Sequence, residues 1–156
     1  MMLPPEGMDQ ERSSPLSVLV VEDDQIVLPF LRLALARLGY VTLAAPDCAS
    51  ALATAEDPGV QIDAVLADVQ LPDGNGGEVA RQIRELRPDA GVVLMSGSPE
   101  ELVWAGHNDA SLTLVAKPFD SLQLDLALRA ALAAATTAGP GPLGPIRSGF
   151  ARFNFR

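Results

Sequence analysis

Short runs of apolar residues recur along the chain and are rich in valine and leucine. Each run has only four to six residues, which is too short for a helix and typical of a buried strand. We therefore predict five strands, at residues 17–21, 41–45, 62–67, 92–95 and 112–116.

The segments between these runs carry apolar residues at helical spacing. The first of them ends before Gly39, and Pro29 within it is tolerated only if the helix begins near Asp24 or Gln25. The spacing is shown by Ile26, Phe30, Leu33, Leu35 and Leu38 in the first segment and by Leu122, Leu126, Leu128 and Leu132 in the last. We predict five helices that alternate with the five strands.

This alternation predicts an α/β fold in which a five-stranded parallel sheet is doubly wound, with helices on both faces. Parallel strands need crossover connections, and strands that are apolar throughout must be covered on both sides. Ligands of such sheets bind beyond the carboxyl ends of the strands, where the strand order reverses. Functional residues should therefore follow the strands.

The domain predicted from this pattern covers residues 17–134. We expect residues 1–16, which are polar and rich in Pro and Ser, to form a flexible leader, and residues 135–156 to form a Gly/Pro linker followed by a tail that contains Phe and Arg. The tail holds three of the five phenylalanines in its last seven residues. It is either a disordered end or a short docking segment. The chain itself is either a stand-alone domain or part of a longer protein.

Composition narrows the possible functions. The net charge of −9 argues against nucleic acid as a partner. The sequence has no apolar stretch of about 18 residues and no secretion signal, so we expect a cytoplasmic protein without a membrane partner. One cysteine and one histidine exclude an intrachain disulfide and a zinc cluster. A metal site would have to use oxygen ligands.

Polar groups follow four of the predicted strands. Glu22, Asp23 and Asp24 follow the first, Asp68 the third, Ser96 the fourth and Lys117 the fifth. In a parallel sheet these groups meet at one edge. Lys117 is the only lysine beside ten arginines, which indicates that a compact ammonium group matters there.

The acids of this cluster need a cation. Two unit charges about 4 Å apart repel by roughly 4 kcal/mol at the effective dielectric of a protein surface. Carboxylates, a carbonyl and water suit Mg2+. With a lysine and a serine hydroxyl nearby, such a site can receive a phosphoryl group, and Asp68 is the candidate nucleophile.

These residues resemble the receiver domain of bacterial response regulators in two-component signalling, over about residues 16–134. Asp68 with Leu71-Pro72 after it looks like the phosphoacceptor and its loop, and Lys117-Pro118 like the lysine with its usual cis proline. The resemblance implies a flavodoxin-like fold. It also implies Mg2+ bound by Asp23, by Asp68, by the backbone carbonyl of Gln70 and, through water, by Glu22.

The resemblance further implies a phosphoprotein in a phosphorelay. A sensor histidine kinase or phosphotransfer protein would donate to Asp68, and Ser96 and Lys117 would hold the phosphoryl oxygens. The output would be a contact with a downstream protein that the sequence does not identify. The chain would not be an enzyme beyond self-phosphorylation and slow autodephosphorylation.

Some residues depart from the family pattern, and other interpretations stay open. Leu114 replaces the aromatic residue that in many receivers changes rotamer on phosphorylation, and the fourth helix, from about Pro99 to Gly106, is short.

One alternative is a Mg2+-dependent phosphohydrolase that forms an aspartyl phosphate, but Gln70 replaces the second acid it needs. A nucleotide-binding module lacks its glycine-rich turn. Singly, Glu22 or Asp24 could cap the first helix, and we expect Asp24 to do so.

Overall fold

The fold is built on a sheet of five parallel strands. A computed structural model describes residues 14–109 and 112–138. The strands of the sheet are β1 (Ser17–Val21), β2 (Val41–Ala45), β3 (Ala64–Asp68), β6 (Gly91–Ser96) and β7 (Thr113–Ala116). The five predicted strands are confirmed, with β3 starting at Ala64 rather than at residue 62 and taking in Asp68.

The strand order across the sheet is β2-β1-β3-β6-β7. The order reverses between β1 and β3, which is the arrangement of flavodoxin-like folds. The doubly wound α/β class is therefore confirmed. The carboxyl ends of β1 and β3 lie side by side, since Val21 is paired with Ala67, and the residues after them are where a ligand site is expected.

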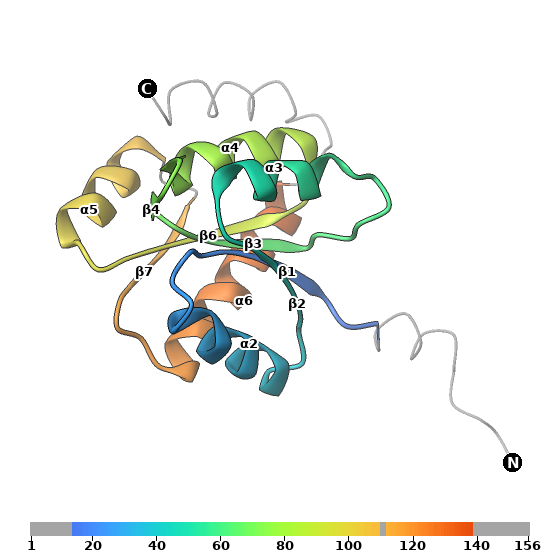
Figure 1. Cartoon of the computed structure of the whole chain (residues 1–156), viewed down its shortest axis with the longest axis horizontal. Coiled ribbons are helices and arrows are strands. Elements are labelled where there is room, and N and C mark those ends of the chain that lie inside the picture. The colour runs from blue at the N-terminus through green and yellow to red at the C-terminus, as the bar shows by residue number, and fades with distance from the viewer. Residues whose placement is uncertain (1–13, 110–111, 139–156) are drawn as a thin grey trace, which may run out of the picture.

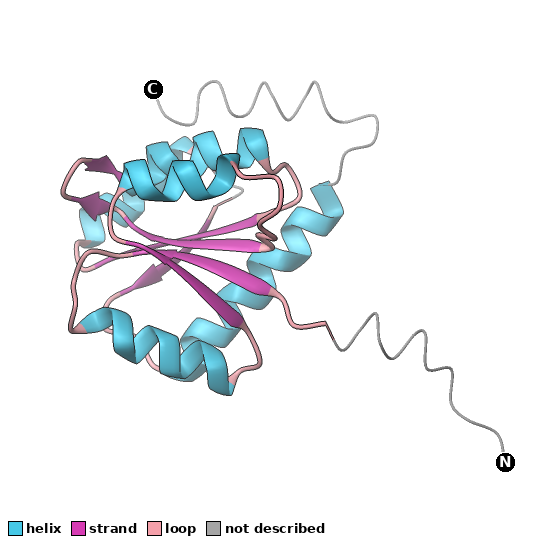
Figure 2. Cartoon of the chain, turned by 45° about the vertical axis from the view of Figure 1, so that its right-hand side comes forward, coloured by secondary structure: helices cyan, strands magenta, loops and turns pink. Residues whose placement is uncertain are grey.

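Five helices cover the two faces of the sheet, as predicted. They are α2 (Val27–Arg37), α3 (Cys48–Glu56), α4 (Gly76–Leu86), α5 (Pro99–Asn108) and α6 (Ser121–Ala138). Helices α3, α4 and α5 pack on one face and α2 and α6 on the other, as Figures 1 and 2 show. Each face encloses its own apolar core.

Not every apolar residue that marked the helical spacing is buried. In α2, Leu35 lies in the core, whereas Phe30 and Leu33 are exposed, as is Ile26 just before the helix. The buried face of α2 is formed by Leu31, Ala34 and Leu35. In α6, likewise, Leu128 is buried, but Leu122 and Leu126 are exposed and Leu124 takes their place in the core.

The loop after β3 contains an element that the sequence did not predict. Strands β4 (Gln70–Leu71) and β5 (Gly74–Asn75) form a small antiparallel hairpin. Gly76 then packs directly against the backbone of β3, because a Cβ atom there would lie 1.9 Å from the carbonyl oxygen of Asp68. Only glycine fits this position without moving the phosphoacceptor candidate.

The predicted chain ends lie mostly outside the described residues. The leader at 1–16 is described only from residue 14, and nearly all of the linker and tail follows the last described residue, Ala138. Helix α6 continues to Ala138, past residue 134, where the predicted domain ends. Among the described residues, no helix has the length and apolarity needed to cross a membrane.

Candidate functional site

The end of β1 contributes an acid that is fully buried. The side chain of Glu22 has no exposed surface, and its carboxylate accepts hydrogen bonds from the Asp24 backbone N–H (3.0 Å) and from Lys117 Nζ (3.2 Å). Burial raises the pKa of Glu22 above its ordinary value, and the hydrogen bond from the Asp24 backbone and the charge of Lys117 counteract this only in part. The acid therefore depends on the lysine for its charge partner.

Asp24 has a different role from Glu22. Its Oδ1 atom accepts hydrogen bonds from the backbone N–H groups of Ile26 (2.8 Å) and Val27 (3.3 Å) at the start of α2. The expectation that Asp24 caps this helix is not met, because the N-cap residue is Ile26 and no side chain caps it; Asp24 instead binds the backbone of the turn that leads into α2. Because α2 begins at Val27, Pro29 lies in the first turn, where its missing N–H removes no helical hydrogen bond.

Asp68 stands at the end of β3 with both carboxylate oxygens engaged. Oδ1 accepts a hydrogen bond from the Gln70 backbone N–H (2.9 Å), and Oδ2 accepts one from Lys117 Nζ. Only 13% of the side chain is exposed. The two contacts hold the carboxylate in place in the lining of the pocket described below.

Lys117 follows β7 and reaches across the sheet edge to Asp68 and Glu22. Its backbone N–H donates to the carbonyl of Ser96 (2.8 Å), and its peptide bond with Pro118 is cis. Burial alone would lower the pKa of Lys117, but hydrogen bonds and charge interactions with Asp68 and Glu22 outweigh that effect and raise it. Lys117 thus stays charged and acts as the cation of the cluster.

Ser96 ends β6 and is almost completely buried. Its hydroxyl oxygen accepts a hydrogen bond from the Ser98 backbone N–H (2.9 Å) and donates its proton to Glu101 Oε1 (2.5 Å). The other carboxylate oxygen of Glu101 accepts a hydrogen bond from Gln70 Nε2 (2.7 Å). Sequence reasoning missed Glu101, because an acid in the first turn of a helix is ordinary. Its position five residues after Ser96 is the only sign in the sequence.

These side chains surround one open pocket of about 680 Å3. Its lining includes Asp23, Asp68, Gln70, Ser96, Glu101 and Lys117. The structure thus brings together the predicted phosphoacceptor, hydroxyl and lysine with Asp23 and Gln70. Glu22 is not part of the lining, since its carboxylate faces Lys117 and the Asp24 backbone.

The donor set of the pocket suits Mg2+. Asp23 lines the pocket and forms no salt bridge within the described part of the chain. Two carboxylates and the Gln70 carbonyl are hard oxygen donors, and Mg2+ keeps several water ligands. Residues 14–109 and 112–138 contain no group of three His, Cys, Asp or Glu side chains placed to hold a metal. A site that uses water and a carbonyl does not require such a group.

The chain is similar over most of its length to known signalling proteins. The family model described as the response regulator receiver domain matches residues 18–129. The probable transcriptional regulatory protein TcrX of Mycobacterium tuberculosis is 32% identical over 80% of this chain and 53% of its own length. The KDP operon transcriptional regulatory protein KdpE of Escherichia coli is 35% identical over 81% of this chain and 56% of its own. The chain thus spans about half the length of these relatives.

Solved structures give the same result. A response regulator receiver protein from Sinorhizobium medicae has a TM-score of 0.70 and 29% identity, and covers 78% of this chain and 98% of its own. A response regulator receiver domain protein from Methanospirillum hungatei has a TM-score of 0.69 and 26% identity, and covers 81% of this chain and 100% of its own.

Proposed function

Because the chain belongs to the family of response regulator receiver domains, we propose that Asp68 is its phosphoacceptor and that a sensor histidine kinase or a phosphotransfer protein is its donor. Receiver domains are signalling phosphoacceptors rather than enzymes in the usual sense, and they generally bind Mg2+. The observation that carries the proposal is that Asp68 and Ser96, the last residues of β3 and β6, and Lys117, directly after β7, line a single pocket. This arrangement suits a phosphoryl group bonded to Asp68.

The transfer uses the carboxylate of Asp68 as the nucleophile. A carboxylate oxygen bonds to phosphorus while the bond from phosphorus to the donor's imidazole nitrogen breaks, and the imidazole retains that electron pair and takes up a proton. The Gln70 N–H orients the carboxylate, since it binds Oδ1. Lys117, already at Oδ2, neutralises a phosphoryl oxygen as charge builds up.

The bound metal would lie among Asp23, Asp68 and the carbonyl of Gln70, with Glu22 acting through water. When bound, Mg2+ supplies positive charge that stabilises the transferring phosphoryl group. The aspartyl phosphate adds a charge of about −1.5 to −2, and its oxygens seek hydrogen-bond donors. Lys117 and the Ser96 hydroxyl are donors that line the pocket.

Rapid hydrolysis of this phosphate, as in a phosphohydrolase, has less support. The side chain of Gln70 is an amide hydrogen-bonded to Glu101, and an amide does not act as a general acid or base at neutral pH. We therefore expect self-phosphorylation from small donors and slow autodephosphorylation. We propose that the output is a contact with a downstream protein. The relatives are named as transcriptional regulatory proteins and a sensor kinase.

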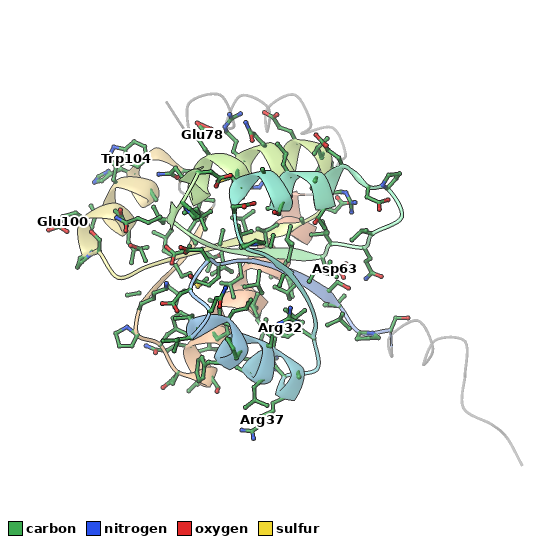
Figure 3. The ribbon with its side chains drawn as sticks, viewed as in Figure 1. Arg32, Arg37, Asp63, Glu78, Glu100 and Trp104 are labelled. Atoms are coloured by element: carbon green, nitrogen blue, oxygen red, sulfur yellow. The ribbon has the colours of Figure 1, made fainter. Side chains whose placement is uncertain are left out.

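The test is incubation with Mg2+ and acetyl phosphate, followed by intact mass measurement. We expect the wild-type chain to gain one phosphoryl group and Asp68→Asn to gain none. Asp63→Asn is the matched control, because Asp63 directly precedes β3 and lies at the amino end of this strand (Figure 3). Removal of its negative charge should leave phosphate uptake unchanged. Equal uptake by Asp68→Asn and the wild type would contradict the proposal.

A further inference from the structure

Glu101 links three elements around the pocket through its two carboxylate oxygens. Oε1 accepts the proton of the Ser96 hydroxyl at the end of β6 (2.5 Å), and Oε2 accepts a hydrogen bond from Gln70 Nε2 in β4 (2.7 Å). Glu101 itself belongs to the first turn of α5. The start of α5 is thereby tied to the loop that follows Asp68.

The bond to Ser96 conflicts with the proposed function of that residue. A serine hydroxyl has one proton, so it donates either to Glu101 or to a phosphoryl oxygen, and not to both. The oxygen of this hydroxyl already accepts the Ser98 N–H at 2.9 Å. Ser96 is only 3% exposed, so water has little access to replace either partner.

Charge adds to this conflict. Glu101 and Asp68 line the same pocket, and Glu101 takes part in no salt bridge among the described residues. A phosphoryl group on Asp68 brings about −1.5 to −2 charge into a space that already holds this carboxylate. Like charges in a partly buried site repel, so the phosphorylated state favours the departure of Glu101.

Helix α5 is packed in a way that permits such a movement. Among the side chains of α5 that the structure describes, only Ala105 lies in the apolar core, and Val103 and Trp104 are exposed. By contrast, α4 on the same face buries Val79, Ala80 and Ile83. Elements with few buried apolar contacts are the ones that shift at small free-energy cost.

We propose that Glu101 is a positioning residue that holds Ser96 and the start of α5 in the unphosphorylated arrangement, and that the phosphoryl group on Asp68 displaces it by taking the Ser96 proton. This inference rests on the proposed function, since it needs a phosphoryl group at Asp68. Release of Glu101 would free the first turn of α5 and change the surroundings of Trp104, one turn further along. Leu114 replaces the usual aromatic switch residue, so this bond offers a different route from the site to the surface.

The experiment uses beryllium fluoride with Mg2+ as a phosphoryl mimic and the fluorescence of Trp104, the only tryptophan of the chain, as the readout. Glu101→Ala removes both the charge and the acceptor, and should bind the mimic about tenfold more tightly, because a hydrogen bond to a charged group no longer competes for Ser96. Its fluorescence without ligand should lie nearer to the ligand-bound value. Glu101→Gln keeps the size of the side chain and a hydrogen-bond acceptor, so its affinity for the mimic should rise less.

Glu100→Gln is the matched control. Glu100 is the preceding residue on α5, and among the described residues its carboxylate accepts a hydrogen bond only from the Ser98 hydroxyl (3.1 Å). Figure 3 shows it pointing away from the molecule. We expect its affinity for the mimic to equal that of the wild type. If Glu101 acts only on the fold, Glu101→Ala should raise the affinity for the mimic by the same factor with or without the Ser96 hydroxyl. We expect instead a smaller rise in affinity when Glu101→Ala is combined with Ser96→Ala.

The outcomes separate the two proposals. If the wild type does not bind the mimic, the proposed function fails. A second outcome is that the wild type binds the mimic, while both Glu101 variants keep the wild-type unfolding midpoint and bind the mimic no more tightly. Glu101 then does not hold Ser96, and this inference alone is overturned. An equal gain with and without the Ser96 hydroxyl would likewise overturn the competition for its proton.

Discussion

At the scale of single residues, Lys117 explains how two acids, Glu22 and Asp68, coexist at one sheet edge. Glu22 and Asp68 both bind its Nζ atom, so one ammonium group compensates two carboxylates. A lysine suits this task because its ammonium is compact and its stem is flexible. The same group can therefore follow the negative charge when a phosphoryl group arrives at Asp68.

A second residue-scale feature is the thiol of Cys48 at the start of α3. Burial and the neighbouring Asp73 raise its pKa to about 11 from an ordinary value of 9.0. At about pH 8 the thiolate fraction in the folded chain should therefore be about a hundredfold lower than in the unfolded chain. Alkylation by iodoacetamide should be slower in the folded chain by at least that factor, and should speed up as the pH rises toward about 11.

The contribution of Asp73 to this thiol can be measured separately. Asp73→Asn removes a negative charge next to the sulfur but keeps an acceptor for the Cys48 N–H, which lies 2.8 Å from Asp73 Oδ1, so alkylation should become faster. Asp57→Asn, at the other end of α3, should change nothing. Equal alkylation rates for the folded wild type and the unfolded chain would show that the thiol is not protected.

The sequence predicted several of the residues that line the pocket. Asp68, Ser96 and Lys117 were predictable because each follows an apolar run, and parallel strands must bring such positions together. Asp23 and Gln70 also line the pocket. Glu101 could not be predicted, because its role depends on the direction of a side chain from α5 toward Ser96. The direct bond between Glu22 and Lys117 was not foreseen for the same reason.

At the scale of elements, the sequence predicted which segments are helices better than which sides of them are buried. Helix α2 has leucines or other apolar residues on more than one side, so spacing alone does not choose between Leu31 and Leu33. Packing against the sheet buries Leu31 and Leu35 and leaves Phe30 and Leu33 exposed. The β4–β5 hairpin escaped prediction because each of its strands has only two residues.

The contact between Gly76 and β3 gives a prediction at this scale. In Gly76→Ala, the new methyl group would overlap the backbone of Asp68 and Val69, and these atoms cannot move without shifting the strand end or α4. We expect a loss of about 2–3 kcal/mol in the free energy of unfolding, measured by urea denaturation. Phosphate uptake at Asp68 should also slow down.

Gly97→Ala is the control for this variant. Gly97 also lines the pocket, but a Cβ atom there would meet no atom within 4 Å. We expect the free energy of unfolding of Gly97→Ala to lie within about 0.5 kcal/mol of the wild-type value. The same urea midpoint for Gly76→Ala and the wild type would show that the start of α4 can move away from β3 at no measurable cost.

At the scale of the whole molecule, the topology of the parallel sheet explains how the site is held in place and why it is open to ligands. The sheet places four strand ends at a single edge, and its two faces are sealed by separate apolar cores. Polar groups that would be costly in either core lie instead at the edge, where they pair with one another. The fold was predictable at this scale because the alternation of strands and helices leaves few other arrangements.

The last prediction concerns the chain after Ala138. All the residues of the proposed site lie between Glu22 and Lys117, and helix α6 ends at Ala138. A variant without residues 139–156 should therefore take up phosphate from acetyl phosphate at the wild-type rate and keep the wild-type unfolding midpoint. A slower uptake would show that this segment supports the site.

The same variant tests whether the segment docks on a partner. It carries three arginines and no acid, so the net charge of −9 becomes −12 without it, and three of the five phenylalanines are lost. Loss of positive charge and aromatic surface should weaken binding to a partner protein in a pull-down, while phosphorylation stays intact. Unchanged binding would contradict a docking role, and because phosphorylation is measured on the same protein, that result could not be attributed to misfolding.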